Sequence, residues 1–109
     1  MKKRRKYLFV CDDVKKWEPI VEDVSVDIRE DLRWCSDFEV CGLDSIEERH
    51  FDYFNKFERI YSLDGKSVER LQERFGLESY IFRIFKFNVN GQSDMALGAR
   101  LFQLIHQDL

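Results

Sequence analysis

Side chains that could do chemistry are concentrated in residues 11–18, directly after a run of four apolar residues. The segment holds one thiol, three carboxylates and an indole. These side chains belong to Cys11, Asp12, Asp13, Glu18 and Trp17. A thiol can act as a nucleophile, carboxylates can exchange protons or attract cations, and an exposed indole can anchor a partner.

The elements that must position this segment alternate between short apolar runs and amphipathic stretches. The apolar runs, typical of buried strands, cover residues 7–10, 38–43, 58–63 and 80–87. The amphipathic stretches, typical of helices, cover residues 19–34, 45–54 and 67–75, and a last one begins near Ser93. This order predicts an α/β fold in which helices cover both faces of a parallel sheet.

Residues 11–18 follow the first predicted strand, and this position matters for function. In open parallel sheets, ligands bind beyond the carboxyl ends of the strands. The single proline of the chain, Pro19, is suited to the first turn of a helix, where its missing N–H costs no hydrogen bond. The sequence therefore predicts that residues 11–18 form a loop at the place where an active site is expected.

Length and charge restrict the function classes. A chain of 109 residues forms one domain, and 44% apolar residues, ten Phe among them, supply a core. Residues 1–6 carry five positive charges, whereas residues 7–109 hold 13 basic and 21 acidic side chains, a net charge of −8. We therefore expect a basic tail of residues 1–6 before an acidic domain of residues 7–109. Such a domain repels a phosphate backbone, which makes nucleic acid an unfavourable partner.

Cysteine, histidine and hydropathy patterns indicate a cytoplasmic protein with no membrane contact. Three cysteines are too few for a disulfide scaffold, and no apolar run approaches the roughly 20 residues that span a bilayer. His50 and His106 lie far apart, and the acidic residues lack the spacing of a calcium loop, so we expect no metal site. We expect no cofactor either.

Several motifs resemble the low-molecular-weight protein tyrosine phosphatases, in particular their short predicted-phosphatase branch. The family opens with a basic start, a strand of the type L-F-V-C, and then C-x5-R-S-P before a helix. Here Leu-Phe-Val-Cys at residues 8–11, Pro19 and Glu22 are in register, and residues 70–76 are similar to a later family stretch. The resemblance implies a phosphotyrosine phosphatase I-like fold with strand order 2-1-3-4.

The same resemblance implies that the catalytic loop is degenerate. Cys11 holds the position of the nucleophile, but Trp17 replaces the arginine that clamps the phosphate, and Glu18 replaces the following Ser or Thr. Val14 replaces the Asn that braces the loop. The acidic pair that supplies the general acid corresponds to residues 88–91, Asn-Val-Asn-Gly, while Asp94 belongs to the first turn of the last helix.

Local charge also indicates that the loop cannot hold a phosphate. Asp12, Asp13 and Glu18 surround a position that would have to hold a dianion, and negative charge near Cys11 raises the pKa of its thiol. We therefore expect a noncatalytic, phosphatase-like domain, a pseudophosphatase. It would bind a protein partner or a small ligand at the mouth of the former phosphate loop, through the five side chains named at the outset. Trp17 would either fill the vacated pocket or anchor the partner.

Two other functions remain open from the sequence. The first is a divergent cysteine-dependent tyrosine phosphatase or arsenate reductase that uses Cys11, although Cys35 and Cys41 do not match the spacing of an arsenate-reductase relay. The second is a regulatory protein whose basic tail contacts nucleic acid, with a merely solubilising tail as the alternative.

Overall fold

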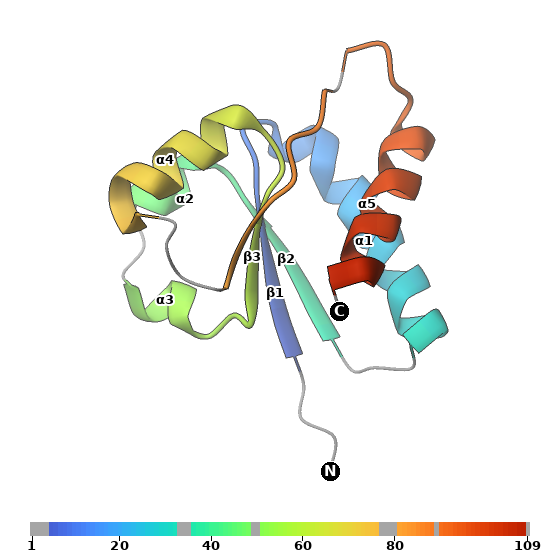
Figure 1. The fold of residues 1–109 in the computed structure, drawn as a ribbon, viewed down its shortest axis with the longest axis horizontal. Helices are drawn as coiled ribbons and strands as arrows, with labels where there is room; N and C mark the ends of the chain where they lie inside the picture. Colours follow the sequence, from blue (N-terminus) through green and yellow to red (C-terminus); the bar gives the residue numbers. More distant parts are fainter. Residues whose placement is uncertain (1–4, 33–35, 49–50, 77–80, 89, 109) are drawn as a thin grey trace.

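Four parallel strands form the sheet, in the order β2-β1-β3-β4 that was predicted (Figure 1). They are β1 (Arg5–Val10), β2 (Ser36–Cys41), β3 (Arg59–Ser62) and β4 (Phe82–Ile84). β1 is central: Val10 is in register with Cys41 of β2 on one side and with Ser62 of β3 on the other. The computed structural model describes residues 5–32, 36–48, 51–76, 81–88 and 90–108.

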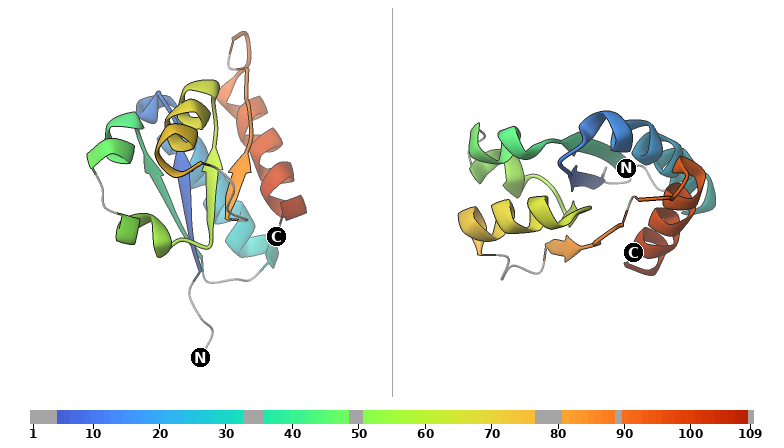
Figure 2. Two further views of the ribbon diagram at one scale, coloured as in Figure 1. Left: turned by 60° about the vertical axis from the view of Figure 1, so that its left-hand side comes forward. Right: turned by 90° about the horizontal axis from the view of Figure 1, so that it is seen from above.

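Helices cover both faces of the sheet, also as predicted (Figure 2). They are α1 (Val14–Leu32), α2 (Leu43–Glu48), α3 (Phe51–Asn55), α4 (Gly65–Phe75) and α5 (Asp94–Asp108). α1 and α5 lie side by side on one face, and α2, α3 and α4 lie on the other. In the described part of the chain, no helix combines the length and the apolar character needed to cross a bilayer.

The apolar run of β1 is explained by burial on both faces. Side chains of a strand point alternately to opposite faces. Tyr7 and Phe9 join the core beneath α1 and α5, whereas Leu8 and Val10 join the core beneath the other helices. All four are 0–1% exposed. A run without polar alternation is therefore what a central, doubly covered strand requires.

A partly buried carboxylate links the end of α5 to the sheet. Asp108 accepts a hydrogen bond from the Tyr61 hydroxyl at 2.9 Å and another from Arg83 Nε at 2.7 Å. Arg59 Nε lies 3.5 Å from the same carboxylate. Burial, followed by the charge of Asp108, raises the pKa of Tyr61, so its hydroxyl remains a donor throughout the physiological range. These contacts join β3, β4 and α5.

Several predicted boundaries were wrong. The helix predicted to start at Pro19 starts at Val14, and Pro19 lies inside it. The single helix predicted for residues 45–54 is α2 followed by α3, and it starts at Leu43, so no capping box begins at Ser45. β4 is shorter than predicted and forms an edge of the sheet. The predicted helix end at Trp34 and strand start at Tyr80 lie outside the described residues.

The expected tail is shorter than six residues. Arg5 and Lys6 belong to β1, where they are in register with Ser36 and Asp37 of β2. Residues 1–4 lie outside the described part of the chain. Any truncation that is meant to spare the sheet must therefore stop at residue 4.

The packing of α5 generates a stability prediction. Leu101 is 0% exposed and Met95 is 85% exposed on the same helix. We expect Leu101→Ala to lower the free energy of unfolding by about 2–5 kcal/mol, because it removes apolar contacts and leaves a cavity. Met95→Ala should change it by no more than about 0.5 kcal/mol. Urea unfolding measures both, and equal effects of the two variants would contradict the described packing of α5.

Candidate functional site

The expected loop at residues 11–18 is instead a two-residue turn followed by a helix. α1 begins at Val14, directly after Asp12 and Asp13. Asp13 caps the helix: its Oδ1 accepts a hydrogen bond from the Lys16 amide at 3.2 Å, and its carbonyl accepts one from the Trp17 amide at 3.2 Å. Asp is a favoured residue at this position because its side chain satisfies an N–H group of the first turn.

Because α1 starts before Pro19, the helix loses one backbone hydrogen bond at this residue. Proline in a helix interior has no N–H to donate to the carbonyl four residues earlier, which here belongs to Lys15. The gain is the burial of the first apolar turn. Trp17 lies in this turn and is 2% exposed, so the helical start at Val14 accompanies the burial of its indole in the core. The prediction that Pro19 marks the helix start was wrong for this reason.

Cys11 is buried and is a poor nucleophile. Its side chain is 0% exposed, and its Sγ lies 3.9 Å from the carbonyl oxygen of Cys41. Burial raises the pKa of the Cys11 thiol to about 12, and the nearby Asp64 carboxylate adds to the increase. Cys41 belongs to the core on the opposite face of the sheet. Cys35 lies outside the described residues.

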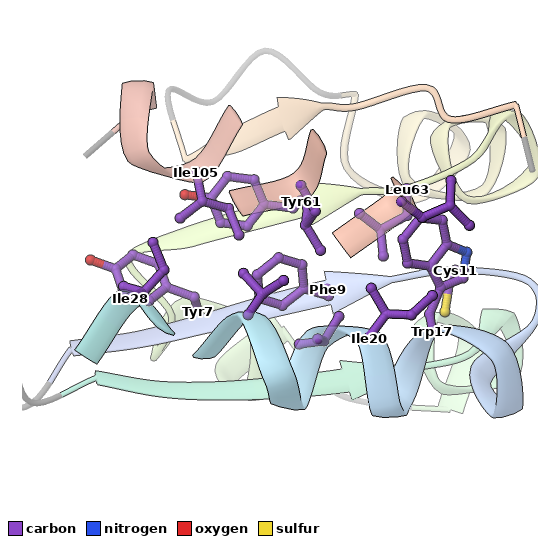
Figure 3. Packing of buried hydrophobic residues seen from close by; sticks show 13 residues of the cluster. Tyr7, Phe9, Cys11, Trp17, Ile20, Ile28, Tyr61, Leu63 and Ile105 are labelled. Carbon is purple, nitrogen blue, oxygen red and sulfur yellow. The ribbon is translucent and has the colours of Figure 1, made fainter. Parts of the chain in front are cut away.

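Trp17 also belongs to the core rather than to a surface. Its ring centroid lies 5.1 Å from that of Phe87, at an interplanar angle of 59°. Figure 3 shows the indole at the same end of the cluster as Cys11 and Leu63. The expectation of an exposed anchor does not fit this position, because the side chain has almost no surface to offer a partner.

Asp64, beside this site, is one of the residues that the sequence interpretation missed. Its Oδ1 accepts the Ser67 amide at 2.8 Å and so caps α4, while its Oδ2 accepts the Asp12 amide at 2.7 Å. The carboxylate therefore links the turns that follow β1 and β3, the two strands between which the chain order reverses. A cap residue followed three positions later by a second polar residue, directly before an amphipathic helix, was the available signal.

Exposed carboxylates surround a hollow of about 400 Å³ at the carboxyl ends of β1 and β2. Its carboxylates are Asp12, Asp13, Asp44 and Glu47, and its cationic side chains are Lys15 and Arg70. Arg70 forms an ion pair with Glu47, and Lys66 pairs with Asp12 at 3.2 Å. The net charge of the lining is negative.

The five residues proposed from the sequence therefore separate into three groups. Asp12 and Asp13 line the hollow. Cys11 and Trp17 are buried in the core. Glu18 is exposed on α1 but is not part of the lining. Asp44 and Glu47, which come from α2, were not predicted as site residues.

Asn88, Asn90 and Gly91, in the segment that the phosphatase resemblance aligned with a general acid, are exposed. Asn88 Oδ1 accepts a hydrogen bond from the Asn90 amide at 3.1 Å, and Gly91 has a φ of +74°, which favours glycine. Asp94 lies in the first turn of α5, as predicted, and its Oδ1 is 3.3 Å from Lys16 Nζ. Ser93 caps this helix through its hydroxyl, which accepts the Ala96 amide at 3.2 Å.

Neither a metal-binding cluster nor a similar known protein identifies the chemistry of this site. Within the described ranges, His, Cys, Asp and Glu side chains form no group of three or more that could hold a metal ion. No protein-family model, curated protein or solved structure matches the chain. The acidic hollow and the buried thiol are therefore the features that bear on function.

The buried thiol predicts a pH dependence of stability. An unfolded Cys11 ionises near pH 9, whereas the native thiol ionises near pH 12. Between these values only the unfolded state has lost the proton, so the free energy of unfolding falls as pH rises, by at most about 1.4 kcal/mol per pH unit. Well below pH 9 the thiol contributes almost no pH dependence.

Cys11→Ala should therefore lose less stability than the wild type between about pH 8 and about pH 10. Urea unfolding at both pH values gives the difference, and the contributions of the tyrosines cancel because both proteins retain them. Parallel losses in the two proteins would show that the native thiol ionises as readily as the unfolded one.

Proposed function

We propose that this chain is a cytoplasmic, noncatalytic domain of phosphatase-like design that binds its ligand at the acidic hollow. The observation that supports this proposal is the start of α1 at Val14, which leaves Cys11 buried behind a two-residue turn. A phosphatase of the type that the sequence resembles needs an accessible thiolate and a loop long enough to surround a phosphate. A buried thiol and a short turn supply neither.

Three backbone amides near Cys11 already donate within the chain. A phosphate site needs several backbone N–H groups aimed at the same anion. Here the Asp12 amide donates to Asp64, and the Lys16 and Trp17 amides donate to Asp13. The chain's own carboxylates and carbonyl thus take the hydrogen bonds that a phosphate would need, and their charge opposes an incoming anion.

The sign of the charge favours a cationic ligand. Four carboxylates line the hollow against two cationic side chains, and one of these, Arg70, is paired with Glu47. A Lys or Arg side chain of a protein partner could neutralise Asp13 and Asp44 without displacing an existing ion pair of the described residues. A small molecule with an amine or guanidinium group has the same chemistry.

The two alternative functions have less support. A cysteine-dependent phosphatase or arsenate reductase would require Cys11 to leave the core and ionise against a raised pKa. Nucleic-acid binding would rest on the tail, of which residues 1–4 lie outside the described part of the chain. Salt-sensitive DNA binding that disappears when residues 1–4 are deleted would favour the tail, and this deletion leaves β1 intact.

The absence of thiol chemistry is tested with p-nitrophenyl phosphate. We expect the wild type and Cys11→Ser to hydrolyse it at the same rate as buffer, because the thiol is protonated and enclosed. Absorbance of p-nitrophenolate measures the rate. Hydrolysis by the wild type that disappears in Cys11→Ser would overturn the noncatalytic proposal.

The hollow itself is tested with two probes of opposite charge, arginine and inorganic phosphate, followed by amide NMR. We expect arginine, but not phosphate, to shift the Gly42 and Asp44 amides, since both residues line the hollow. Asp13→Asn combined with Asp44→Asn should weaken arginine binding about 3- to 30-fold, as expected for the loss of two exposed ion pairs. Asp52→Asn on α3 is the control, because Asp52 is exposed outside the lining. A larger effect of phosphate than of arginine would contradict the proposal.

A further inference from the structure

α5 has apolar residues on more than the side that faces the sheet. From residue 95 to residue 102, Arg100 is the one charged residue. Leu97 and Leu101 are buried against the sheet, but Met95 is 85% exposed and Ala99 is exposed as well. Helices that are apolar nearly all round are usually covered on all sides. The first half of α5 therefore presents a second apolar side that no described element covers.

This second side forms one wall of a groove between α1 and α5. The groove has a volume of about 400 Å³, and Met95 and Phe102 lie on its α5 side. Gly98 belongs to its lining, and a Cβ there would make ordinary van der Waals contacts with Ile20 Cγ2 at 3.6 Å and Val24 Cγ2 at 3.9 Å. Small residues at 98 and 99 permit the side chains or backbone of another helix to approach closely. α1 and α5 run alongside each other at this place (Figure 1).

Acidic side chains flank the same groove. Asp23 and Asp27 lie on α1, are exposed, and line the groove together with Asp94. Residues four apart on a helix have Cβ atoms about 6 Å apart, so two like charges at this spacing repel each other. No Lys or Arg belongs to the described lining. A positive charge supplied from outside would relieve the repulsion between Asp23 and Asp27.

We propose that the α1/α5 groove docks an amphipathic helix of a partner protein whose apolar stripe is flanked by Lys or Arg. The apolar stripe would lie over Met95, Ala99 and Phe102, and its cations would meet Asp23 and Asp27. Docking of a helix into an apolar groove is a common mode of peptide recognition. The groove shares no lining residue with the acidic hollow, so this proposal is independent of the proposed function.

A second copy of the chain fits the α1/α5 groove less well than a helix of a partner protein. The described helix with the most regular basic side is α4, which carries Lys66, Arg70 and Arg74. Its apolar residues Val68 and Leu71 are buried against its own sheet. It therefore cannot present an apolar stripe and a basic edge together without leaving the fold.

The probe for this groove is a dye-labelled helix of about 18 residues, or five turns, with a leucine stripe flanked by lysines. A matched peptide carries glutamates in place of the lysines. Fluorescence anisotropy should show binding of the lysine peptide alone. Asp23→Asn combined with Asp27→Asn should weaken it about 3- to 30-fold, as should added salt. Ala99→Glu should block binding, because a long charged side chain would enter the groove.

Glu69→Gln combined with Glu73→Gln is the matched control. It removes two exposed charges at the same spacing from α4, on the opposite face of the sheet, and should leave binding unchanged. Asp13→Asn combined with Asp44→Asn should also leave it unchanged, which separates this groove from the acidic hollow. The proposal is overturned if both peptides bind equally, or if the α4 control weakens binding as much as the α1 variant.

Self-association is the remaining outcome to be examined. Sedimentation of the protein without peptide should show no concentration-dependent dimer. A dimer that is lost in Ala99→Glu would identify a second copy as the occupant and overturn the proposed partner helix. The two Asn substitutions are nearly isosteric and surface-exposed, so the test stands even if Ala99→Glu does not fold.

Discussion

One carboxylate, that of Asp64, holds together the turns at the carboxyl ends of the sheet strands. One of its oxygens caps α4, and the other accepts the amide of Asp12. The turn after β1 is thereby fastened to the turn after β3, and α1 begins within two residues of that fastening. Because the fixed anion is part of the chain, its charge also disfavours ionisation of the neighbouring Cys11 thiol. A single side chain thus connects the topology of the sheet with the electrostatics of the site.

The anion at this edge of the sheet is part of the chain: the Asp64 carboxylate accepts the Asp12 amide, and Asp13 accepts the Lys16 and Trp17 amides. The hollow beside these turns has an acidic rim. Charged surfaces of this kind steer partners of opposite sign and exclude others. In the proposed function, selectivity at this edge would depend on the sign of the ligand's charge, because the Cys11 thiol lies in the core.

Element order was predictable because alternating apolar and amphipathic stretches are a strong signal in a doubly covered parallel sheet. The strand order 2-1-3-4 was expected only from the family resemblance. The start of α1 was not, because Asp13 as a cap and Pro19 as a first-turn residue are competing local signals. Burial of Trp17, a tertiary effect, decides between them. Asp12 and Asp13 were predictable at the site, but Asp44 and Glu47 reach it only through the parallel pairing of β1 with β2. Burial of Cys11 likewise depends on helices that are distant in sequence.

The central position of β1 has a consequence for the order of assembly during translation. β1 comes before the other strands of the sheet in the sequence. Its two neighbours, β2 and β3, end only at Cys41 and Ser62. A nascent chain therefore carries an apolar strand with open edges while most of the domain is still to be made, and such strands pair readily with other chains. Residues 2–6 are all lysine or arginine, and the last two of them begin that strand. Like charge beside an apolar strand disfavours pairing between copies, so we expect these residues to matter most before β3 closes the second edge.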